Sequence, residues 1–135
     1  MRNGGTGSAR RALGDAGEEL AARWYVKAGF TVVDRNWRCR EGELDLVVAR
    51  AGIVVFCEVK TRRGARFGAP FEAVTITKQR RIRGLAVQWL AEHARMDVTG
   101  KGVPGTGAME VRFDVASVTA PPGAPPTIEV ITGAF

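Results

Sequence analysis

The sequence predicts an α/β fold in which two helices flank a central mixed sheet of five strands. Two segments place apolar residues at helical spacing, and five shorter segments have the alternation or composition of strands. Their order along the chain is helix, three strands, helix, two strands, or α-β-β-β-α-β-β. This order is typical of one sheet with helices packed on it.

The first helix is expected over residues 11–28. Its apolar stripe consists of Leu13, Gly17, Leu20 and Trp24. The following "AGF" contains Gly29, and glycine readily adopts the left-handed conformation that ends many helices. We therefore expect Gly29 to cap this helix.

Strands are expected on both sides of the second helix. A short turn signal, "RAG", joins the second and third strands into a hairpin, and a proline-rich loop, "TAPPGAPP", joins the last two. The five expected strands are residues 30–38, 43–49, 53–61, 110–118 and 127–132.

The second helix is expected from about Thr77 to His93, with Thr77 as the N-cap. A glycine- and arginine-rich loop precedes it, and a glycine-rich connection follows it. Its buried face is predicted to consist of Ile82, Leu85, Ala86, Trp89 and Leu90.

The 135 residues correspond to one ordinary domain. Residues 1–10 are expected to form a flexible basic tail and residues 11–135 a single domain. Neither a secretory signal nor a bilayer-spanning apolar run is evident. The two cysteines suggest no disulfide framework, and Cys57 is expected to be a buried thiol rather than a ligand. These features predict a cytoplasmic location.

Charged residues interrupt the central hairpin, where a half-buried sheet normally carries valine or threonine. Side chains two apart on a strand share a face. Glu43 and Asp45 therefore point to one side of the second strand, and Glu58 and Lys60 point to one side of the third. A turn of two or four residues is predicted to place Asp45 across from Phe56 and Glu43 across from Glu58. Asp45 would then lie diagonal to Glu58.

Three carboxylates this close repel one another, and burying them unpaired is costly. A divalent cation resolves both problems, because Mg²⁺ takes oxygen ligands and needs only one or two carboxylates plus a substrate phosphate. Lys60 is then suited to orient water or to neutralise developing charge. The alternative is an edge hairpin whose charges point into water, with Lys60 paired to Glu58.

Several ordered motifs resemble a known family. The segments "GDAGEELAARWYVKAGF", "NWRCREGELDLV", "FCEVKTR", "FGAPFEAVT" and "KQRRIRGLAVQWL" are similar to the YraN-like family of small, uncharacterised bacterial proteins. That family resembles nucleases of the restriction-endonuclease-like PD-(D/E)xK fold, including archaeal Holliday junction resolvases. The resemblance implies a single nuclease-like domain over residues 11–135, with a Mg²⁺ or Mn²⁺ site at the open end of the hairpin.

The resemblance also implies roles for individual residues. Asp45 matches the motif aspartate, and Glu58 and Lys60 match the E-x-K pair. Glu18, in "GDAGE", matches the first-helix glutamate that completes the metal site in resolvase-like proteins. Glu43 is expected to orient Lys60 or a water at the metal. Leu44 stands where the motif's proline would be, a position that varies in this fold.

The net charge of +6, carried in clusters, favours a polyanionic partner, most simply DNA. Expected phosphate contacts are Arg38, Arg40, Arg62, Arg63, Arg66, Lys78 and Arg81. The leading hypothesis is a metal-dependent endonuclease acting on branched or damaged DNA, with a homodimer plausible by analogy with resolvases. The alternatives are an accessory protein that binds nucleic acid on a nuclease scaffold without cleaving it, and a protein-interaction domain with a structural ion pair.

Overall fold

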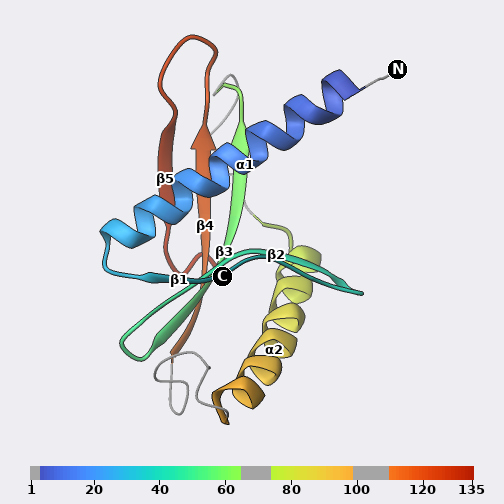
Figure 1. Cartoon of the computed structure of the whole chain (residues 1–135), viewed down its shortest axis with the longest axis vertical. Helices are drawn as coiled ribbons and strands as arrows, with labels where there is room; N and C mark the ends of the chain where they lie inside the picture. Colours follow the sequence, from blue (N-terminus) through green and yellow to red (C-terminus); the bar gives the residue numbers. More distant parts are fainter. Residues whose placement is uncertain (1–3, 65–73, 99–109) are drawn as a thin grey trace.

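The computed structural model describes residues 4–64, 74–98 and 110–135, with side chains described within 11–64, 74–93 and 110–135. In these residues five strands form one mixed sheet, and two helices flank it (Figure 1). The predicted fold class and element order are confirmed. The elements are α1 (Gly4–Lys27), β1 (Thr31–Cys39), β2 (Gly42–Arg50), β3 (Ile53–Arg62), α2 (Ile76–Val98), β4 (Glu110–Thr119) and β5 (Thr127–Ile131).

The spatial order of the strands follows the sequence, β1-β2-β3-β4-β5. Every neighbouring pair is antiparallel except β3 and β4, which run parallel from Ile53 opposite Glu110 to Arg62 opposite Thr119. A parallel pair needs a long crossover connection, and α2 lies in the connection between these two strands. The glutamate of the E-x-K motif therefore lies on the central strand of the sheet.

The turn between β2 and β3 contains only two residues. Arg50 pairs with Ile53, so Ala51 and Gly52 alone reverse the chain. Gly52 has a φ of 81°, in the left-handed region that a tight hairpin turn requires and that glycine tolerates without strain. This short turn determines the register of the whole hairpin.

The two faces of the sheet carry separate cores, because alternate residues of each strand point to opposite sides. On the α1 face, Tyr25 is fully buried; on the α2 face, Trp89 is fully buried. In Figure 1, α1 crosses the sheet while α2 lies beside β2. The α1-face cluster includes Ala21, Ala22, Tyr25, Leu46, Val48, Val55, Cys57 and Ala116, and the α2-face cluster includes Leu44, Val47, Phe56, Ile82, Leu85, Trp89, Phe113 and Val115.

The helices are longer than predicted, and the N-cap of the second helix differs. α1 begins at Gly4 rather than near residue 11, because no proline interrupts its hydrogen bonding there. The predicted C-cap is confirmed, since Gly29 has a φ of 91°. Thr75, not Thr77, caps α2: its Oγ1 accepts the backbone N–H of Lys78 at 3.1 Å.

Cys57 is a buried free thiol in the α1-face cluster, as predicted. Cys39 is also a free thiol, at the end of β1. Within the described ranges, neither helix combines the length and the apolar character that a bilayer crossing demands. The cytoplasmic location and the homodimer stay predictions.

Candidate functional site

The register of the central hairpin differs from the one predicted. The sequence placed Asp45 across from Phe56, and Glu43 across from Glu58. In the structure Val47 lies across from Phe56, a shift of two residues along β2, because the two turn residues are Ala51 and Gly52 and the first pair is Arg50 with Ile53. The prediction of the partners was therefore wrong. The shared face is nevertheless preserved, because Asp45 and Glu58 each come one residue beyond the last pair, Leu46 with Cys57.

Asp45 lies where β2 and β3 separate. The pairing ends at Leu46 opposite Cys57, and beyond it the Oδ2 atom of Asp45 accepts the backbone N–H of Val59 at 2.9 Å. The aspartate side chain thus replaces a backbone acceptor on the neighbouring strand. This contact fixes one carboxylate oxygen of Asp45 beside Glu58.

The electrostatic surroundings of Asp45 disfavour its charge. Burial, and next the charge of Glu58, raise the pKa of the Asp45 carboxyl from 3.8 to about 7. The hydrogen bond from Val59 acts in the opposite direction, while the nearby charges of Glu18 and Glu43 raise the pKa further. The charges of the other three predicted acidic residues therefore all act on Asp45.

Glu18 reaches this cluster because α1 packs closely on β3. Gly17 faces Thr61 with no room for a side chain, so any larger residue there would push the helix away from the sheet. The pKa of Glu18 is raised, first by burial, while a hydrogen bond with the Asn36 side chain lowers it and the charges of Asp15 and Glu43 raise it. The predicted helix glutamate is thus held near the end of the hairpin.

Asn36 is a residue that the sequence analysis missed. It lies on β1 between Arg35, which pairs with Leu46, and Trp37, which pairs with Leu44, and hence beside Asp45. Its φ of 50° is the one positive value among the non-glycine residues of the described ranges. The signal was present in the sequence, because asparagine is uncommon inside a strand and is one of the few residues that tolerate this conformation.

A pocket of about 500 Å³ opens above the acidic residues. The tip of the β1–β2 hairpin forms one wall, and the first turns of α2 form the other. Asp45 and Glu58 line it, whereas Lys60 and Glu18 do not. Its lining consists of Arg38, Cys39, Arg40, Glu41, Gly42, Glu43, Asp45, Glu58, Lys78, Arg81, Ile82 and Leu85.

Both walls of this pocket carry predicted phosphate contacts. Arg38 and Arg40 belong to the hairpin, and Lys78 and Arg81 to α2. The Lys78 Nζ atom lies 2.6 Å from Glu58 Oε2, and Arg38 Nε lies 3.8 Å from Glu43 Oε2. The cations therefore surround the acidic residues.

The remaining predicted basic residues lie elsewhere. Arg62 ends β3 and Arg63 follows it, and neither lines the pocket. Arg66 lies outside the described residues. Lys60 pairs with Ser117 in the parallel β3–β4 ladder and does not line the pocket, whereas Lys78 of α2 does.

The donor chemistry of this site fits a hard divalent cation. Asp45 and Glu58 supply carboxylate oxygens from adjacent strands, and Mg²⁺ needs only one or two carboxylates when water and phosphate complete its shell. Among the described residues no three histidine, cysteine, aspartate or glutamate side chains are grouped closely enough to hold a metal by themselves. Any such ion would therefore rely on two carboxylates and on non-protein ligands.

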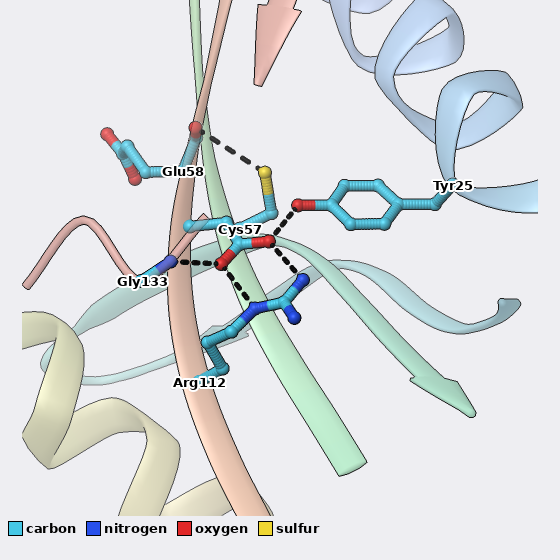
Figure 2. Close-up of polar contacts among 6 residues, drawn as sticks. Tyr25, Cys57, Glu58, Arg112 and Gly133 are labelled. Atoms are coloured by element: carbon cyan, nitrogen blue, oxygen red, sulfur yellow. Dashed lines mark hydrogen bonds and ion pairs between the residues drawn. The ribbon is translucent and has the colours of Figure 1, made fainter. Parts of the chain in front are cut away.

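A second buried carboxylate lies on the other side of β3. Asp114 on β4 has no solvent exposure and pairs with Cys57. Figure 2 shows Tyr25, Arg112 and Gly133 converging on one carboxylate. The Tyr25 hydroxyl donates to Oδ2 at 2.6 Å, Arg112 donates to both oxygens at 2.9 Å, and the Gly133 N–H donates to Oδ1 at 3.0 Å.

This network was also missed by the sequence analysis, because its members come from both ends of the chain. Its arginine is partly visible in the sequence, since Arg112 and Asp114 share a face of β4. The network secures β4 against β3 one residue before Glu58, where the Cys57 Sγ donates to the Glu58 carbonyl at 3.7 Å (Figure 2). It supports the site without entering the pocket.

Comparison with known proteins gives a consistent result. A family model described as "Uncharacterised protein family UPF0102" matches residues 17–118. A UPF0102 protein of Acidothermus cellulolyticus is 53% identical over 133 residues, covering 97% of this chain and 98% of its own. A relative from Frankia alni is 50% identical over 127 residues, covering 94% and 97%. A relative from Rhodococcus opacus is 49% identical over 124 residues, covering 92% and 96%.

Proposed function

The chain belongs to the uncharacterised protein family UPF0102, the YraN-like family that its motifs resemble, and from that premise we propose that it is a divalent-metal-dependent endonuclease. Its substrate would be the phosphodiester backbone of DNA, branched or damaged DNA in particular. One observation carries the proposal: Asp45 lies beside Glu58 at a cation-walled pocket, with its pKa raised to about 7. A carboxylate in these surroundings gains from a bound cation, which favours its charged form.

Asp45 and Glu58 would hold the ion, with Glu18 as the neighbouring third carboxylate. When bound, Mg²⁺ or Mn²⁺ supplies activation of water and stabilisation of charge on a phosphoryl oxygen. The Val59 N–H already fixes one oxygen of Asp45, Oδ2, and a metal would take an oxygen of the same carboxylate. Glu43 lies at the pocket edge, where it orients groups around this centre.

The two walls would hold the nucleic-acid backbone. One wall is the tip of the β1–β2 hairpin, with Arg38 and Arg40. The other wall is the start of α2, with Lys78 and Arg81. Contacts of this kind neutralise phosphates and position a strand without reading its sequence. We therefore expect binding that weakens as salt rises and that depends on the shape of the DNA more than on its base sequence.

The direct test is cleavage of branched, duplex and single-stranded DNA with Mg²⁺ or Mn²⁺. We expect Asp45→Ala and Glu58→Ala each to lower the rate by about a hundredfold or more, because each removes a ligand of the ion. Glu92→Ala is the matched control, since Glu92 is an exposed carboxylate of α2 outside the pocket. Cutting that survives both pocket substitutions would contradict the proposed site.

A second function is favoured by a separate observation. Lys78 already contacts Glu58, and no three-ligand group exists among the described residues. Such a site suits an accessory protein that binds nucleic acid and leaves it intact. It predicts salt-dependent binding, unchanged by Asp45→Ala, with no cleavage in any metal. Metal-binding calorimetry on the wild type and Asp45→Ala separates the two functions.

A further inference from the structure

The amine of Lys78, on α2, lies against the acidic centre. Its Nζ lies 2.6 Å from Glu58 Oε2, and the Glu58 side chain is only 13% exposed. The backbone N–H of Lys78 donates to Thr75 Oγ1, so the residue is held in the first turn of α2. The ion pair thus joins α2 to β3 across the pocket. It is a defined contact between secondary-structure elements, not a loose pair of surface charges.

The Lys78 ammonium lies beside the group of carboxylates formed by Asp45, Glu58 and their neighbours. Glu58 is the strongest charged neighbour of Asp45, and Lys78 contacts Glu58 from the opposite wall. A divalent cation bound by Asp45 and Glu58 would share the Glu58 carboxylate with the Lys78 ammonium, whose Nζ contacts Oε2. The two positive charges would repel each other across this small group, so the lysine and the metal compete for one carboxylate.

We propose that Lys78 is a positioning residue that holds Glu58 in the metal-free protein and is displaced toward a phosphate of the substrate when the metal binds. This inference rests on the proposed metal site. The displaced ammonium remains in the pocket with Arg81, which lies one turn further along α2. Metal binding then adds a cation for DNA, and by linkage DNA tightens metal binding by the same factor.

The first test is Mn²⁺ binding, measured by calorimetry on the full chain without DNA. Lys78→Met removes the competitor, and we expect it to bind Mn²⁺ about fivefold or more tightly than the control, within the range of ordinary coupling between sites. The control is Arg80→Met, which removes one positive charge from the same turn. Arg80 is exposed and outside the pocket. Its substitution therefore measures how much the loss of one positive charge on α2 changes Mn²⁺ affinity without any contact to Glu58.

Lys78→Arg gives a second variant that keeps the charge and the ion pair. We expect its Mn²⁺ affinity to stay within about twofold of the wild type. Equal affinities for Lys78→Met and Arg80→Met, or weaker binding by Lys78→Met, would overturn the proposed displacement. Circular dichroism of each variant verifies that the fold is retained.

The second test measures the coupling itself. A fluorescent phosphorothioate duplex resists cleavage, and its anisotropy reports DNA binding with and without Mn²⁺. Mn²⁺ itself contacts a phosphate, so it should tighten binding in all three proteins, but by a clearly smaller factor in Lys78→Met than in the wild type and in Arg80→Met. Equal tightening in all three proteins would contradict the role of Lys78.

The two proposals fail in different ways. If the wild type binds Mn²⁺ and Asp45→Ala does not, the metal site stands, and an unchanged Lys78→Met affinity overturns only the role of the lysine. If no protein binds Mn²⁺, the metal site and the displacement are both overturned.

Discussion

Two aspartates lie on opposite faces of the same sheet: Asp45 is half-buried and Asp114 is fully buried. They differ in how their charge is balanced. Asp114 has no solvent exposure and accepts hydrogen bonds from Tyr25, Arg112 and Gly133. Asp45 accepts one backbone hydrogen bond from Val59, and its strongest charged neighbour is another carboxylate.

The difference separates a carboxylate that maintains the fold from one that is available for chemistry. A buried charge with a guanidinium and several donors is stable as it is, and removing either partner leaves the other uncompensated. A carboxylate beside three others is costly until a cation arrives. A buried carboxylate with cationic and hydrogen-bonding partners, such as Asp114, therefore indicates a structural role. A carboxylate whose main charged neighbours are other carboxylates, such as Asp45, indicates a functional site.

The strongest test of the comparison is Asp114→Ala. We expect the free energy of unfolding to fall by about 3–5 kcal/mol, because Arg112 and the Tyr25 hydroxyl lose their buried partner. Denaturant titration followed by circular dichroism measures this change. Asp15→Ala, at an exposed position of α1, serves as the control and should change stability by less than about 0.5 kcal/mol. A similar loss of unfolding free energy in both variants would contradict a structural role for the Asp114 network.

A smaller loss is expected for Tyr25→Phe. The substitution keeps the ring and its edge contact with Phe30, and removes only the hydroxyl that donates to Asp114 at 2.6 Å. A hydrogen bond to a charged acceptor contributes about 1.5–3 kcal/mol, so the free energy of unfolding should fall by that amount. Burial raises the pKa of Tyr25 above its ordinary value, so the hydroxyl remains a donor throughout the neutral range. A neutral effect would mean that Arg112 alone balances Asp114.

The smallest expected effect has the opposite sign. In metal-free protein with a chelator present, Asp45→Asn should raise the free energy of unfolding. The pKa of Asp45 is raised from 3.8 to about 7 on folding, so its stabilising contribution is present below the unfolded value and is lost as pH rises through 7. The variant has no such loss, so its advantage should grow between about pH 4 and about pH 7, level off above that, and reach at least the equivalent of one pKa unit, about 1.4 kcal/mol.

Thermal unfolding of both proteins across this pH range, with and without Mg²⁺, measures the effect. Saturating Mg²⁺ should reverse the difference at high pH, because only the wild type gains the bound ion. A difference that stays flat with pH would contradict the raised pKa, and a difference unaffected by Mg²⁺ would argue against metal binding at Asp45.

The strands show how far local pattern predicts this molecule. Each predicted strand overlaps the observed one to within about two residues at either end, because alternation depends only on neighbouring residues. The common face of Asp45 and Glu58 follows from the same period of two. The partners of Asp45 did not follow, since register depends on how the two-residue turn closes at Gly52.

By itself, the sequence determined the α/β class, the element order, the family and the acidic residues of the hairpin, since periodicity and motif spacing are properties of adjacent positions. Only the tertiary structure decided which groups balance them. The Tyr25 hydroxyl meets a carboxylate 89 residues away, and Lys78 of α2 contacts Glu58 of β3. The physical reason is that charge balance depends on distances between segments that the chain brings together only when it folds.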